Sequence, residues 1–216
     1  LVRLSDDGCG IASDQLLLAV ASHATSKIRD ADDLFQVSTL GFRGEALASI
    51  AEVSRLRLRS RRPEDAGAAE LEVTGGQIGP VTPCAGPVGT LIEIRQLFYN
   101  TPVRRKFMRS PQTELGHSSE AFLRIAIAHP EVHFTLRHGE RLLHDLPPVE
   151  DLRERIAALL GREIAEGLIP IASSDGPIHL SGYVAHPDHT RSHNRLQYVF
   201  LNGRHIRDKA LGHALG

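Results

Sequence analysis

The sequence predicts an α+β chain in which a two-layer α/β sandwich is followed by a second, truncated α/β domain. Leu47, Ile50 and Ala51 recur at helical spacing, and a series of strands with alternating polarity follows them. Pro147-Pro148 is the only convincing linker, and another helix with three strand-like runs lies beyond it. We therefore expect one domain over residues 1–146 and a second over residues 149–216.

The first domain is expected to open with a strand over residues 1–4, followed by a tight glycine-containing turn. Ser13 is the expected N-cap of a helix that continues to about residue 22, with Leu16, Leu17 and Val20 facing inward. A long amphipathic helix is expected over about 118–128. The strands expected after the Leu47 helix alternate in polarity or end at glycine turns: 55–60, 71–73, a return from 78, 89–95, 132–138 and 141–146.

The second domain is expected to begin with a helix over residues 150–160, which Gly161 can end. Strands are predicted over 164–171, 178–185 and 196–201. A tight turn at Asn202-Gly203-Arg204 precedes a final helix that starts at Asp208. The predicted order in this domain is helix, three strands and helix.

Composition excludes several classes of protein. The formal net charge of −1 over 216 residues provides no global field for nucleic acid or membrane. Two cysteines are too few for a disulfide framework, and the twelve histidines show no metal-ligand spacing. The sequence shows no signal peptide or transmembrane run, so we expect a cytoplasmic protein. Because it starts in mid-strand without an initiator Met, we expect a fragment cut at both ends.

A second glycine-bearing loop, Gly41-Phe42-Arg43-Gly44-Glu45, runs directly into the helix that carries Ala46 and Leu47. Glycine allows such a loop to fold its N–H groups inward, and the helix start adds unpaired N–H groups. Arg43 can donate two parallel hydrogen bonds to a phosphate. The stretch predicts a phosphate cradle, although an ordinary loop before an ordinary helix would show the same residues.

The turn at Asp6 has the residues expected for binding the base of a nucleotide. A carboxylate at a strand end can accept a hydrogen bond from the exocyclic amine of adenine. Gly8 and Gly10 would let a flat base approach the backbone, and Thr25, Ser26 and Lys27 could contact sugar or phosphate. The alternative for Asp6 is a purely turn-forming role. The three elements together predict an adenine-nucleotide site.

The sequence resembles the N-terminal ATPase region of MutL-type DNA mismatch-repair proteins, which share a superfamily with DNA gyrase B subunits, heat-shock chaperones and sensor histidine kinases. The segments that carry the resemblance are Asp6–Ile11, His23–Ile28, Gly41–Ile50, Gly89-Thr90, Leu97–Phe107 and Phe200–Arg204. The Gly41–Ile50 and Phe98–Phe107 blocks are specific to MutL relatives. The resemblance implies an ATPase domain followed by a ribosomal S5 domain 2-like second domain.

The resemblance also implies site residues and partners. Asp6 would bind the adenine amino group, Thr90 would support the base beside it, and Gly8, Gly10 and Ile11 would shape the pocket. Thr25, Ser26 and Lys27 would lie in a mobile lid. The phosphates would be wrapped by Gly41, Phe42, Arg43, Gly44, Glu45, Ala46 and Leu47. Arg204, Arg207 and Lys209 would face DNA. The implied partners are a MutS-type mismatch-recognition protein, DNA and a second copy paired on ATP binding, with no membrane.

The family's general base is a glutamate, and its Mg²⁺ ligand is an asparagine, both on a helix that precedes the Asp6 motif. Both are expected upstream of Leu1, so we expect ATP hydrolysis in the intact protein and an inactive fragment. Two other readings remain open. The arginine-rich run over 55–62 allows a nucleotide-independent DNA-binding clamp, and the glycine loops allow a type II topoisomerase ATPase subunit.

Overall fold

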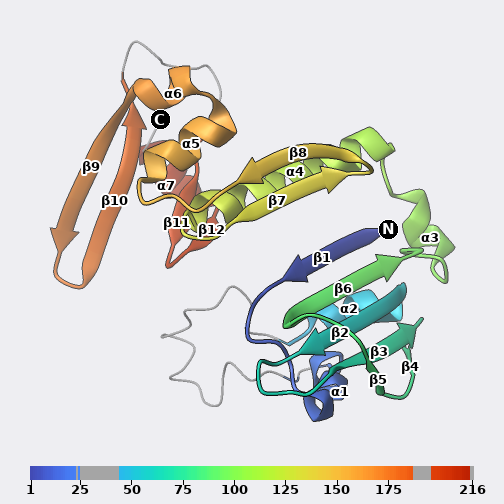
Figure 1. Ribbon diagram of the computed structural model, residues 1–216. Helices are drawn as coiled ribbons and strands as arrows, with labels where there is room; N and C mark the ends of the chain where they lie inside the picture. Colours follow the sequence, from blue (N-terminus) through green and yellow to red (C-terminus); the bar gives the residue numbers. More distant parts are fainter. Residues whose placement is uncertain (23, 25–43, 187–195, 215–216) are drawn as a thin grey trace. The chain divides into compact units, whose positions relative to one another are not determined.

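A computed structural model of the protein describes residues 1–22, 24, 44–186 and 196–214. The chain divides into two compact units, residues 1–109 and 110–216 (Figure 1). Both units contain helices and strands, which confirms the predicted α+β class. The boundary predicted at Pro147-Pro148 lies inside the second unit. That boundary remains a prediction.

The first unit contains one antiparallel sheet of six strands, in the order β1-β6-β2-β3-β4, with β5 also paired to β3. The strands are β1 Val2–Asp6, β2 Arg55–Arg61, β3 Ala68–Thr74, β4 Gln77–Ile78, β5 Thr82–Cys84 and β6 Gly89–Arg95. The predicted strand over 89–95 is therefore confirmed at both ends. The Gly75-Gly76 turn joins β3 to β4, as predicted.

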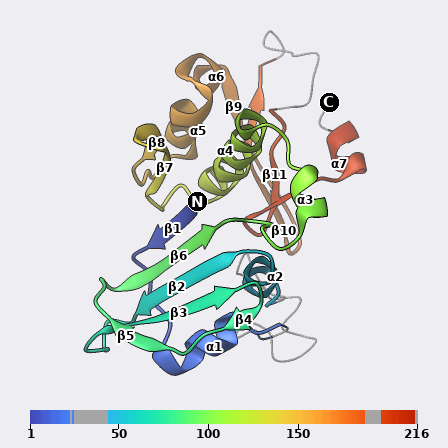
Figure 2. The ribbon, with the colours of Figure 1, turned by 90° about the vertical axis from the view of Figure 1, so that its right-hand side faces the viewer.

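Short helices cover one face of this sheet. They are η1 Ser13–Gln15, α1 Leu16–Ala19 and α2 Ala46–Glu52. Helix α1 contacts β3, and α2 contacts both β2 and β3 (Figure 2). The buried side chains between the two layers are Leu16, Val20, Ala51, Leu56, Leu58, Ala69, Leu71 and Val73. Alternation along β2 and β3 puts these apolar residues inward and the charged residues outward, which makes the predicted two-layer sandwich.

Two details of the first helix were predicted wrongly. Ser13 is not a cap: it is the first residue of η1, and Ala12 precedes it without a side-chain capping bond. Leu17 is 46% exposed, whereas Leu16 and Val20 are buried. Because α1 ends at Ala19, only the residues spaced four apart, Leu16 and Val20, face the sheet.

The C-terminal end of α2 is tied down by backbone and side-chain donors. The N–H groups of the Gly75-Gly76 turn donate to the carbonyls of Ser54 and Ala51. The Phe98 N–H donates to the Val53 carbonyl, and the Asn100 side chain donates to the Glu52 carbonyl at 2.8 Å. These bonds satisfy carbonyls that a helix leaves unpaired. The block before α3 (Pro102–Lys106) therefore anchors the helix that follows the glycine loop.

Charged pairs cover the outer face of the sheet. Arg57 and Arg59 both donate to the Glu70 carboxylate, at 2.8 and 2.9 Å. Glu93 is buried and accepts from Arg3 at 2.7 Å and from Arg95 at 3.2 Å. Hydrogen bonds from the arginines hold the pKa values of Glu70 and Glu93 below their ordinary value of 4.5. Two arginines of β2, Arg57 and Arg59, are therefore paired with a carboxylate of β3.

These depressed pKa values predict a loss of stability in acid. A carboxylate whose pKa is lower in the folded state stabilises the protein above the unfolded value and ceases to do so as the pH falls through the folded value. We expect the free energy of unfolding to decline below pH 4.5, by about 1 kcal/mol for each carboxylate, because the arginines remain partly exposed. Urea unfolding of Glu70→Gln/Glu93→Gln between pH 3 and 7 tests this. A pH dependence as steep as that of the unchanged protein would contradict it.

The second unit consists of three β-hairpins and four helices within its described residues. The helices are α4 Pro111–Ala128, α5 Leu152–Leu160, α6 Arg162–Glu166 and α7 Lys209–Ala214. The hairpins pair β7 Phe134–His138 with β8 Arg141–Leu146, β9 Leu168–Asp175 with β10 Ile178–Ala185, and β11 Val199–Leu201 with β12 Arg204–Ile206. Within the described residues, no helix has the length and apolar character needed to cross a bilayer.

Three predictions in this unit need correction. Helix α4 begins at Pro111 instead of near residue 118, because the Ser110 hydroxyl caps the Thr113 N–H and proline fits the first turn. Residues 162–166 are helical, so the strand predicted from 164 starts at Leu168. The last strand starts at Val199 instead of Leu196. Strands β8 and β10 lie where they were predicted.

Arg155 joins α5 to the β7–β8 hairpin. Its side chain is buried and donates to four carbonyls, those of Pro130, Val132, Leu146 and Pro147, at 2.7–3.2 Å. Burial lowers the pKa of this guanidinium. Two of these carbonyls precede the β7–β8 hairpin and the other two lie at its end. The Arg155 side chain, which comes from α5 after Pro147-Pro148, therefore links the two ends of the hairpin. This contact joins residues on the two sides of the proline pair within the second unit.

Candidate nucleotide-binding site

One cross-strand row on the helix-covered face brings together the predicted base-binding residues. Asp6 pairs with Thr90, Thr90 with Ser60, Ser60 with Ala69, and Ala69 with Pro83. Residues paired across antiparallel strands project to the same face. The row therefore extends from β1 across the sheet to β5, on the same face as α1 and α2.

Asp6 is exposed and fixed at one oxygen. Its Oδ1 accepts from the Gly8 N–H at 3.0 Å and from the Thr90 N–H at 3.2 Å. Among the described residues, no hydrogen bond reaches its Oδ2. The carboxylate is thus held in one orientation and presents its second oxygen as an acceptor.

Three glycines allow the close backbone approach that builds this corner. A Cβ on Gly89, whose φ is +112°, would lie 2.0 Å from the Asp6 carbonyl oxygen. A Cβ on Gly10, whose φ is +70°, would lie 2.1 Å from the Arg61 carbonyl oxygen, and one on Gly8 would lie 3.1 Å from Asp6 Oδ1. Side chains at the first two positions would overlap backbone atoms. Glycine at these positions brings the Asp6 loop against β6 and β2.

Ser60 lies at the centre of the row and makes three hydrogen bonds through one hydroxyl. Its Oγ accepts from the Ile11 N–H at 2.8 Å and donates to the Gly89 carbonyl at 2.9 Å. The same oxygen lies 3.0 Å from Thr90 Oγ1. Ser60 is 3% exposed, so these contacts are shielded from water. It joins the loop after Asp6 to the start of β6.

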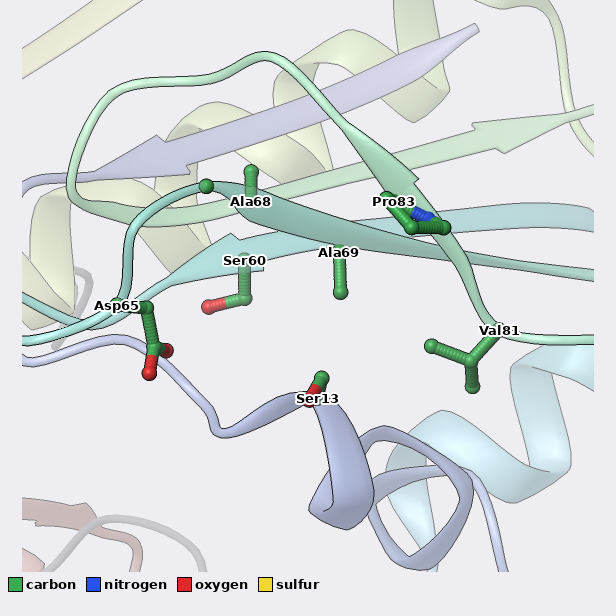
Figure 3. Close-up of a pocket in the computed structure, with 8 residues that line it drawn as sticks. Ser13, Ser60, Asp65, Ala68, Ala69, Val81 and Pro83 are labelled. Carbon is green, nitrogen blue, oxygen red and sulfur yellow. The ribbon is translucent and has the colours of Figure 1, made fainter.

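A cavity of about 390 Å³ adjoins Ser60 on the side away from Thr90. In Figure 3, the side chains of Ser60 and Ala69 point to the same side of the sheet, toward Ser13. The residues that line this cavity are mostly small: Ser13, Ser60, Asp65, Gly67, Ala68, Ala69, Val81 and Pro83. The space beside Ser60 can therefore accept a larger side chain.

The described part of the predicted phosphate loop joins the same layer. Gly44 has a φ of +63°, and a Cβ there would lie 2.0 Å from the Ala24 carbonyl oxygen. Helix α2 starts at Ala46, directly after Glu45. The Ser49 N–H donates a hydrogen bond to the Glu45 carbonyl at 2.9 Å. Leu47 packs on the core cluster that Ile11 also contacts. Both glycine-bearing elements are thus anchored on one apolar core.

The remaining predicted residues of the lid and the phosphate loop lie outside the described residues. They are Thr25, Ser26, Lys27, Gly41, Phe42 and Arg43. Their immediate neighbours Ala24 and Gly44 lie against each other.

The predicted DNA-contacting residues lie close together along the chain in the second unit. Arg204 is the first residue of β12, Arg207 follows that strand, and Lys209 begins α7. Arg207 and Lys209 are exposed, and Arg204 is half-buried. Over the described residues, no group of three or more His, Cys, Asp or Glu side chains could hold a metal ion.

Sequence reasoning missed Ser60. The alternation of β2 places Leu56, Leu58 and Ser60 on the inward face, so a lone hydroxyl follows two leucines toward the core. A buried hydroxyl requires partners. That pattern is a signal for a polar contact, but its partners Ile11 and Thr90 are remote in the sequence.

The chain is similar in sequence to known proteins. Residues 156–216 match a family model described as "DNA mismatch repair protein, C-terminal domain". The DNA mismatch repair protein MutL of Anaeromyxobacter sp. (strain K) is 47% identical over 215 residues, which cover 100% of this chain and 35% of that protein. MutL of Haemophilus influenzae (strain PittGG) is 44% identical with the same coverage. The chain thus spans about a third of the length of these relatives.

A solved structure extends the similarity to three dimensions. The Aquifex aeolicus MutL ATPase domain, complexed with ADP, is 30% identical and has a TM-score of 0.70. The match covers 98% of this chain and 72% of that one. Sequence similarity over the whole chain and a shared fold over both units lead to one assignment. The chain belongs to the MutL family of DNA mismatch-repair proteins.

Proposed function

We propose that this chain is the adenine-nucleotide-binding region of a mismatch-repair ATPase, and that its site lies on the helix-covered face of the first unit. The observation that carries the proposal is the corner formed by Asp6 and Thr90, in which the second carboxylate oxygen projects as an acceptor. The exocyclic amine of adenine supplies the matching donor. The ADP complex of the Aquifex aeolicus domain supports the same class of ligand.

The phosphate end of the proposed site is the loop from Gly41 to Leu47. Arg43 would bind phosphate through its planar guanidinium, and backbone N–H groups at the glycines would complete the cradle. Thr25, Ser26 and Lys27 would belong to the lid. The contact between Ala24, which precedes Thr25, and Gly44, the first described residue of the loop, supports this arrangement.

In the proposed cycle, binding energy at the phosphate loop shifts the chain toward a closed conformation that pairs with a second copy. The intact protein would hydrolyse ATP slowly with Mg²⁺ and then reopen. A MutS-type protein and DNA are the proposed partners, with Arg204, Arg207 and Lys209 facing the DNA. The proposed location is the cytoplasm.

Binding of an ATP analogue to the full-length protein tests the two ends of the site separately. Asp6→Asn is expected to weaken binding roughly 10- to 100-fold, because the amide would put a donor where the adenine amine needs an acceptor. Arg43→Ala is expected to weaken both binding and nucleotide-induced dimerisation by removing a charge-assisted phosphate contact. Calorimetry gives the affinity, and light scattering gives the mass.

Arg162→Ala in the second unit serves as a control for the loss of an exposed arginine. Unchanged affinity and dimerisation in Arg43→Ala would refute the phosphate cradle. Unchanged affinity in Asp6→Asn would refute the base assignment. DNA binding that is independent of nucleotide and falls steeply with salt in both variants would favour the DNA-binding clamp.

A further inference from the structure

We infer that Ser60 fixes the direction of the Thr90 hydroxyl and thereby makes the base end of the site select a ring amine over a ring carbonyl. The inference rests on the proposed nucleotide site and concerns a residue that does not itself touch the base. Ser60 is a positioning residue for Thr90. It determines which hydrogen-bonding group Thr90 offers to the ligand.

The Ser60 hydroxyl has a single proton to donate. The Gly89 carbonyl, 2.9 Å away, can only accept, so that proton is donated to it. The Ile11 N–H donates to Ser60 Oγ at 2.8 Å and occupies one of its two lone pairs. One lone pair remains to accept a hydrogen bond, and Ser60 has no second proton to donate.

The Thr90 hydroxyl must therefore be the donor in the contact between the two side chains. Thr90 Oγ1 lies 3.0 Å from Ser60 Oγ, and only a proton from Thr90 can occupy the remaining lone pair. Since Ser60 is buried, water does not compete for these positions. With its proton directed at Ser60, Thr90 Oγ1 keeps only lone pairs for a ligand.

The neighbouring Asp6 carboxylate also offers only hydrogen-bond acceptors. Asp6 Oδ1 accepts two backbone N–H groups, one of them from Thr90, and Oδ2 remains an acceptor. Two adjacent acceptors, Asp6 Oδ2 and Thr90 Oγ1, thus define the corner. An amine carries two N–H groups and can donate to both acceptors, whereas a carbonyl oxygen at the same ring position meets lone pairs on both sides.

Loss of the Ser60 hydroxyl would release this constraint. Thr90 would regain a rotatable proton and could donate to a carbonyl oxygen, so discrimination between the two base types would weaken. Sites built around buried hydrogen bonds discriminate strongly because the wrong ligand leaves polar groups unpaired. The expected signature is a change in base selectivity that exceeds any change in overall stability.

The test compares Ser60→Val with Ser60→Thr in the full-length protein. The two side chains have the same shape and differ only in the hydroxyl, and the adjoining cavity has room for the added methyl group. Affinities are measured for ATP, with a 6-amino purine, and for inosine triphosphate, with a 6-oxo purine. Ser54→Ala is the matched control, because Ser54 is also buried and its hydroxyl bonds to the Ile50 carbonyl at 2.6 Å, in the core below α2.

We expect Ser60→Val to reduce the ratio of ATP affinity to inosine triphosphate affinity about tenfold, and Ser60→Thr to restore most of it. Ser54→Ala should keep the ratio of the unchanged protein. Equal ratios in Ser60→Val and Ser60→Thr, whether high or low, would overturn the inference. If Ser60→Val does not fold, Ser60→Ala replaces it in the same comparison. Failure of the unchanged protein to prefer ATP would instead refute the proposed nucleotide site.

Discussion

Arg155→Ala is expected to lower the free energy of unfolding of the second unit by about 3–5 kcal/mol. The guanidinium is buried and lies within hydrogen-bond distance of four carbonyls between Pro130 and Pro147. Its removal takes a donor away from each of them, in a place where an unmade hydrogen bond is costly, although the Pro130 carbonyl keeps a backbone donor, the Val149 N–H. It also removes the side chain that packs over the Phe134 ring, 5.8 Å from its centroid. The β7–β8 hairpin would lose its attachment to α5.

Urea unfolding followed by circular dichroism measures the effect, and hydrogen exchange at β7 and β8 locates it. Arg153→Ala is the matched control, because Arg153 lies in the same helix and donates to one carbonyl, that of Leu168. Arg155→Lys should recover only part of the stability, since an ammonium cannot reproduce the planar fork of donors. A loss in Arg155→Ala no larger than that in Arg153→Ala would show that the carbonyls find other donors.

The accuracy of sequence prediction in this chain depended on whether the determining contacts are local. Strands β6, β8 and β10 lie where they were predicted, because their apolar residues and the nearby glycines or prolines are local signals, although at β6 only the start is marked, by Gly89. Leu17 was misplaced because a helix of four residues has too narrow a stripe to bury three positions. The helix over 162–166 was missed because the apolar run from 164 is compatible with either state.

In the candidate site, too, residues in local motifs could be predicted and residues placed by long-range contacts could not. Asp6 and Gly10 were predicted from a short glycine motif, and Thr90 from the family resemblance. Ser60 could not be predicted, since its role arises from strand order: β2 pairs with β6, and β6 with β1. Arg155 also acts at long range, since its side chain reaches back across Pro147-Pro148 to the Pro130 carbonyl.

Gly89→Ala is expected to destabilise the first unit by about 3 kcal/mol or more and to abolish adenine-nucleotide binding. The φ of +112° is strained for any residue with a Cβ, and the added atom would lie 2.0 Å from the Asp6 carbonyl oxygen and 2.9 Å from the Asp7 Cα. Relief requires β6 to move away from the end of β1. That movement would break the bond from the Thr90 N–H to Asp6 and the bond from Ser60 to the Gly89 carbonyl.

Gly67→Ala provides the comparison, because a Cβ there would make only an ordinary contact, 3.7 Å from the Cys84 carbonyl oxygen. Its free energy of unfolding should differ little from that of the unchanged protein. Hydrogen exchange of the Thr90 amide distinguishes the two variants, since this N–H is protected by Asp6 only when β1 and β6 remain in contact. Retained protection would refute the predicted movement of β6. Lost protection with retained nucleotide affinity in Gly89→Ala would mean that the ligand still binds after β6 has moved away from β1. Base recognition would then not depend on the close approach of the two strands, and the acceptor pair of Asp6 and Thr90 could not be its source.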